Sequence, residues 1–148
     1  MNDVVCEPLG ALGELRAYRR PGPPDHLAFE ILREADGRAW TLRLPWEQRA
    51  IVRHLTADTL PRLHEPESFA FNDQGCAEIA RAVLSAQDEV ATIVLEQAGE
   101  HAFAVWRREL SRKGWSWTLD VVVVPLALAD LLCKRMVTGL DRLEQPRR

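Results

Sequence analysis

Hydrophobic and polar residues alternate in two runs of the N-terminal half, at 27–31 and 40–44. Between them lies Asp36-Gly37, a dipeptide typical of the tight turn in a β-hairpin. Successive strand residues point to opposite faces of a sheet, so each run buries one face and exposes the other. The pattern therefore predicts a hairpin, preceded by one short strand at 15–18.

Three further runs with strand character follow in the C-terminal half, at 90–96, 101–110 and 115–124. Turn signals that contain Gly99 and Gly114 separate them, so consecutive runs should pair as antiparallel strands. The last run ends in four consecutive valines, which predicts a central strand that is covered on both faces.

Helices are predicted at three places. Pro45 and Pro125 each precede an apolar stripe with helical spacing, and proline suits the first position of a helix. A third helix, over 72–84, is predicted because apolar residues recur at helical spacing: Cys76, Ile79, Ala80, Val83 and Leu84. Together these elements predict an α+β fold, with one antiparallel sheet of five to six strands and about three helices.

The two halves of the chain repeat a pattern of hairpin, proline and helix. Trp-Thr-Leu occurs at 40–42 and again at 117–119, and each copy is followed by a proline that opens a predicted helix. The whole chain, 1–148, is interpreted as a single domain. Internal halves at 14–60 and 72–144 are a further hypothesis, since any two hairpins of similar composition align about this well.

Periodicity also predicts which side chains form the core. The residues on the apolar side of each predicted element are Phe29, Ile31, Trp40, Leu42, Ile79, Val83, Phe103, Val105, Leu132 and Met136.

Composition limits the classes of protein to be considered. The 148 residues are 47% hydrophobic and 28% charged, as in an ordinary globular domain, and the net charge of −3 argues against a dedicated nucleic-acid binder. No apolar stretch is long enough to span a bilayer, and three widely spaced cysteines suggest reduced thiols. We therefore expect a soluble, cytoplasmic protein that has no membrane partner.

No catalytic or metal-binding signature stands out. The one cluster worth naming is His64 with Glu65 and Glu67, together with the earlier His54, and a small enzyme with a site there is one hypothesis. Asp120 should point to solvent between apolar neighbours. We expect no cofactor and no metal.

A hairpin rich in tryptophan and arginine is the best candidate for a binding surface. Its candidate binding residues are Arg107, Arg108, Arg112, Lys113 and Trp115. Arginine and tryptophan are enriched where proteins bind each other, although aromatic and basic side chains on a sheet also bind single-stranded nucleic acid. The residues thus favour a non-catalytic interaction or accessory protein, as a homo-oligomer or with a protein partner; a nucleic-acid-binding module is the alternative. The leading interpretation of the aromatic face of this hairpin is nevertheless that it is part of the core.

Overall fold

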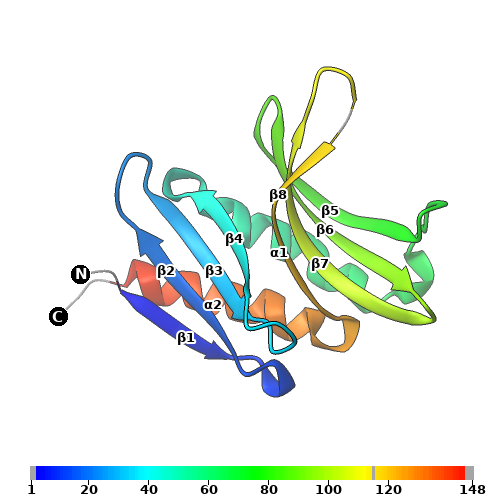
Figure 1. The fold of residues 1–148 in the computed structure, drawn as a ribbon, viewed down its shortest axis with the longest axis horizontal. Coiled ribbons are helices and arrows are strands. Elements are labelled where there is room, and N and C mark those ends of the chain that lie inside the picture. Colours follow the sequence, from blue (N-terminus) through cyan, green and yellow to red (C-terminus); the bar gives the residue numbers. More distant parts are fainter. Residues whose placement is uncertain (1–2, 115, 146–148) are drawn as a thin grey trace.

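The computed structural model describes residues 3–114 and 116–145. Within these ranges the chain forms one antiparallel sheet of eight strands and two α-helices, which lie behind the sheet in Figure 1. The elements in chain order are β1 (Val4–Pro8), β2 (Glu14–Arg20), β3 (His26–Leu32), β4 (Ala39–Pro45), α1 (Ala50–Leu63), β5 (Cys76–Ser85), β6 (Asp88–Gln97), β7 (Glu100–Leu110), β8 (Ser116–Pro125) and α2 (Ala129–Glu144). The mixed class and the antiparallel sheet are confirmed, but the predicted counts of five to six strands and about three helices are wrong.

The predicted helix over 72–84 is the largest error, because this segment is strand β5. Two register shifts in its pairing with β6, between Glu78 and Ala80 and between Val83 and Ser85, interrupt the alternation of inward and outward residues. The inward residues are Ala77, Ile79, Ala82 and Leu84, so the alternation of a regular strand is broken by one step of three. The helical spacing in the sequence appeared because it also counted Val83, which points to solvent. Val83, predicted to be buried, is 65% exposed.

Strand order in the sheet is β1-β2-β3-β4-β8-β7-β6-β5, so two four-stranded meanders meet at β4 and β8. Among the described residues, the register between these two strands consists of one pair, Thr41 with Val121. These two residues are 80 positions apart (121 − 41), as are the prolines that end the strands (125 − 45). After each proline comes a 3-10 turn and then an α-helix. A duplication as the origin of this arrangement stays a prediction.

Each helix packs on strands of the meander that it does not directly follow in the chain. Helix α1, which follows β4, packs on β5 and β6, whereas α2, which follows β8, packs on β1 and β2. Thr59 of α1 hydrogen-bonds Thr92 of β6 at 2.8 Å, and Arg142 of α2 donates to Glu7 of β1 at 2.9 Å. Gly139 lets α2 approach β2 closely, because a Cβ at this position would lie 3.1 Å from the Ala17 Cβ.

The core lies between the sheet and the two helices. Most of the predicted core residues are buried there, and Trp40 is half-buried. The prediction of burial is confirmed for Phe29, Ile31, Leu42, Ile79, Phe103, Val105, Leu132 and Met136. In the described part of the chain, neither α-helix combines the length and the apolar character needed to cross a membrane.

Candidate functional site

Two of the predicted binding residues hold the sheet together. Arg107 forms a bidentate ion pair with Asp88 of β6 (Nε–Oδ1 3.1 Å, Nη2–Oδ2 2.6 Å), and its side chain is 15% exposed. Arg108 pairs with Glu89 (Nε–Oε1 2.6 Å) next to Arg81. Because both guanidinium groups are already paired within the sheet, they have little free charge to offer a partner.

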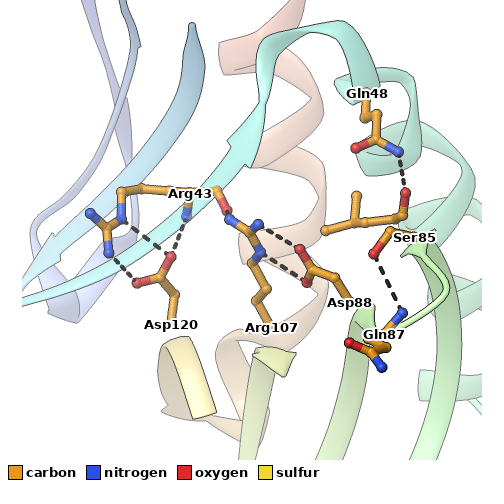
Figure 2. Close-up of polar contacts among 8 residues, drawn as sticks. Arg43, Gln48, Ser85, Gln87, Asp88, Arg107 and Asp120 are labelled. Carbon is orange, nitrogen blue, oxygen red and sulfur yellow. Dashed lines mark hydrogen bonds and ion pairs between the residues drawn. The ribbon is translucent and has the colours of Figure 1, made fainter. Parts of the chain in front are cut away.

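Arg107 also takes part in the joint between the two meanders (Figure 2). Its Nη1 donates to the backbone carbonyl of Arg43 on β4 at 2.7 Å. Arg43 in turn donates three hydrogen bonds to Asp120 of β8, from its backbone N–H (3.2 Å), Nε (3.3 Å) and Nη2 (2.9 Å). The prediction that Asp120 points to solvent is wrong: its side chain is 7% exposed and ties β8 to β4. The hydrogen bond to Asp120 raises the pKa of the Arg43 guanidinium above its usual value.

Arg112 and Lys113 are placed differently, at the turn that joins β7 to β8. The backbone of this turn is closed by a hydrogen bond from Gly114 N–H to the Ser111 carbonyl at 3.0 Å. Both cations are exposed, and neither forms an ion pair with another described residue. They line an open hollow of about 420 Å³ together with Ser111 and Trp117.

The fifth predicted binding residue, Trp115, lies outside the described residues. Its neighbour Trp117 is 60% exposed, on the part of β8 that extends past the joint with β4. We call Ser111, Arg112, Lys113 and Trp117 the tip. In Figure 1 it projects at the upper end of the β5–β8 half, beside the β5–β6 turn. The interpretation of Trp117 as a core residue is therefore wrong.

The β7 strand is held firmly just below the tip. The Leu110 N–H donates to the Gln87 carbonyl in the β5–β6 turn at 2.7 Å, and Trp106 Nε1 donates to Thr118 Oγ1 at 3.0 Å. The tip is thus a protruding loop on a fixed base, which suits a binding element because little backbone order has to be gained on docking.

The histidine cluster does not assemble. His64 ends α1, is 70% exposed, and its Nε2 lies 3.1 Å from Asp130 Oδ2 on α2. That carboxylate also pairs with Lys134 at 2.7 Å, and the hydrogen bond from Lys134 lowers the pKa of Asp130. Within the described ranges no three His, Cys, Asp or Glu side chains come close enough to share a metal ion.

A second hollow lies on β2–β4 and was missed at the level of sequence. Its polar lining residues are Tyr18, Arg20, His26 and Arg43. The alternation of β2 and β3 places them on one face, but their proximity depends on the register of three strands. The sequence Pro-Gly-Pro-Pro at 21–24 could have pointed to this hollow, because it marks a rigid loop beside strands with alternating polar residues.

Comparison with models of known protein families finds no match for this chain, and comparison with curated protein sequences finds none either. The geometry described above is therefore the basis for inferring a function.

Proposed function

We propose that the protein is a non-catalytic interaction protein that docks a protein partner, or a second copy of itself, through the tip of the β7–β8 hairpin. The observation that carries this proposal is the exposure of Trp117, 60%, in a hollow that it shares with Arg112 and Lys113, which have no ion-pair partner among the described residues. A large aromatic side chain left in water beside unpaired charge is typical of an interface anchor with a polar rim.

The free energies of apolar burial and of ion pairing indicate what each tip residue contributes to binding. An indole presents about 150–250 Å² of surface, so burying the exposed part of Trp117 would contribute about 2–4 kcal/mol, before the entropy cost of association. An exposed ion pair contributes only about 0.2–1 kcal/mol. Trp117 therefore supplies most of the affinity, whereas Arg112 and Lys113 select a partner that presents carboxylates around an apolar recess.

The test uses the chain as bait in an extract of its native host, with quantitative mass spectrometry of the retained proteins. Trp117→Ala and the double variant Arg112→Glu/Lys113→Glu remove the two parts of the tip. Arg38→Glu and Leu32→Ser are the matched controls, because both residues are exposed at the β3–β4 turn, at the opposite end of the sheet.

A specific partner should be retained by the wild type and by both controls, and lost with both tip variants. Sedimentation velocity of the same five proteins tests self-association in parallel. If the wild type and the tip variants retain the same proteins and have the same mass in solution, the tip is not the docking element.

A nucleic-acid-binding module is the second candidate, favoured by the same combination of exposed indole and free cations. Single-stranded nucleic acid binds by base stacking on aromatics and by phosphate pairing, and its affinity falls steeply with salt. Anisotropy of a labelled oligothymidine should then show a slope of log K against log salt that decreases by about 1.4 in Arg112→Glu/Lys113→Glu, since each single-strand phosphate contact contributes about 0.7. A protein partner would respond weakly to salt.

A further inference from the structure

The sheet face opposite the helices contains a cavity of about 240 Å³ on β2, β3 and β4. We call it the β2–β4 cavity. It shares no lining residue with the tip, because its strands belong to the first meander and the tip belongs to the second. Its lining residues come from these three strands and from the loop 21–24.

Strand register explains why the sheet surface is hollowed at this point. Tyr18, Ala28 and Arg43 lie in one row across the three strands, with Ala28 in the middle. The small Ala28 side chain, 1% exposed, forms the floor, and the two long neighbours rise on either side. The next row contributes Arg20 opposite His26. A recess between long side chains thus follows directly from an alanine at the central position.

The outer wall is the loop 21–24, and it is fixed in place. Asp25 Oδ1 accepts a hydrogen bond from the Gly22 N–H at 3.0 Å, and its carboxylate pairs with Arg19. The hydrogen bond from Arg19, followed by that from Gly22, lowers the pKa of Asp25. Gly22 has φ +125°, which side-chain-bearing residues rarely adopt. Three prolines give this wall an apolar surface that does not need to be ordered on binding.

The charges in the cavity favour an anion. Arg20 is exposed and has no ion-pair partner in the described ranges, whereas Arg43 is neutralised by Asp120. The Tyr18 hydroxyl donates to Glu30 Oε1 at 2.7 Å, which orients the ring. Burial, followed by this hydrogen bond to Glu30, raises the pKa of Tyr18, so the phenol stays neutral. One free guanidinium, a neighbouring imidazole and a fixed aromatic ring beside prolines therefore converge on one space.

We infer that the β2–β4 cavity binds a small organic anion, in which a flat apolar ring carries one carboxylate or one phosphate. Arg20 pairs with the anionic group beside His26, and the ring lies between Tyr18 and the proline wall. The volume of about 240 Å³ corresponds to roughly eight water molecules and suits a ligand of roughly ten non-hydrogen atoms. A ligand of that size should bind with a dissociation constant of about 0.1–1 mM.

The experiment is a titration of ¹⁵N-labelled protein followed by amide chemical shifts. The probes are benzoate, phenyl phosphate, inorganic phosphate and the neutral benzyl alcohol. Benzoate or phenyl phosphate should shift the amides of Gly22 and Ala28, and the tighter of the two identifies the anionic group. Arg20→Gln should weaken that binding about threefold to fivefold, and Arg38→Gln, which removes another exposed arginine at the β3–β4 turn, should leave it unchanged.

Three results would overturn the inference: no saturable shift with either aromatic anion, equal binding by Arg20→Gln, or shifts with inorganic phosphate as large as those with phenyl phosphate. The last result would mean that charge alone attracts the probe. Arg112→Glu/Lys113→Glu should bind the aromatic anions like the wild type, so failure of the tip proposal and failure of this one are distinguishable.

Discussion

Replacing Asp120 with alanine should destabilise the protein at the joint between the two meanders. The carboxylate is 7% exposed and accepts three hydrogen bonds from Arg43, one of them from the backbone N–H. A hydrogen bond to a charged group contributes about 1.5–3 kcal/mol. Because the Arg43 side chain is 51% exposed, its guanidinium regains water once the carboxylate is lost, which keeps the cost below that of a fully buried pair. We expect a loss of about 2–3 kcal/mol.

Urea unfolding, followed by tryptophan fluorescence and by circular dichroism, measures this loss. For a chain of this length the change corresponds to a decrease in Tm of about 4–12 °C. Asp120→Asn keeps an acceptor for the Arg43 N–H and should cost about half as much. Asp141→Ala is the matched control, because its carboxylate also pairs with an arginine, Arg53, but is 53% exposed.

The reasoning fails if Asp120→Ala loses under about 0.5 kcal/mol, or no more than Asp141→Ala, since an exposed pair contributes little. A double-mutant cycle with Arg43→Ala isolates the pair itself. A coupling energy near zero would show that the joint is held by β-sheet pairing and apolar contacts alone.

Four more measurements test the core, the thiols and the helix interface. Leu132→Ala should cost about 2–5 kcal/mol in urea unfolding because the side chain is fully buried, and a loss under half a kcal/mol would mean that α2 is packed in another register. Burial raises the pKa of the Cys133 thiol to about 12, so at pH 8 an aromatic disulfide reagent should label exposed Cys6 quickly and Cys133 only on unfolding; equal rates would contradict this burial. Reductant should leave Tm unchanged. The hydrogen bond from Arg53 lowers the pKa of Glu144 below 4.5, so the folded state binds fewer protons there than the unfolded state. The stability that the ionised Glu144 contributes is present above pH 4.5 and is lost as the pH falls through the lowered pKa of the folded state. Glu144→Gln should therefore flatten that part of the curve of unfolding free energy against pH.

Local patterns predicted the elements whose alternation or period is regular. The hairpin of β3 and β4 and the helix after Pro125 depend on neighbours close in the chain, so their signals are visible in the sequence. Strand β5 was not predictable in this way, because its bulges break the alternation and apolar residues such as Val83 also occur on its exposed face. Strand β1 has five residues at the edge of the sheet, only one of them buried, so no clear alternation develops.

In the candidate site, too, local features were predictable from the sequence and contacts between distant strands were not. Arg112 and Lys113 are exposed, and this follows from local sequence because they adjoin the turn signal at Gly114. The pairing of Arg107 with Asp88 depends on strand register, and the pairing of Arg43 with Asp120 joins residues 77 positions apart. Neither contact could be read from local sequence. The hypothesis of a binding hairpin therefore remains a prediction for the tip, whereas the inner arginines stabilise the sheet.

The crossed arrangement of the helices has a consequence for how the chain can be divided. Helix α1 covers strands of the second unit and α2 covers strands of the first, so neither half of the polypeptide encloses an apolar core of its own. A cut in the connection between α1 and β5 leaves two fragments that need each other in order to fold. The same geometry means that two molecules could exchange their C-terminal halves through this connection and keep every interior contact. Reciprocal exchange would yield an interlocked dimer whose surface, tips included, is that of two monomers.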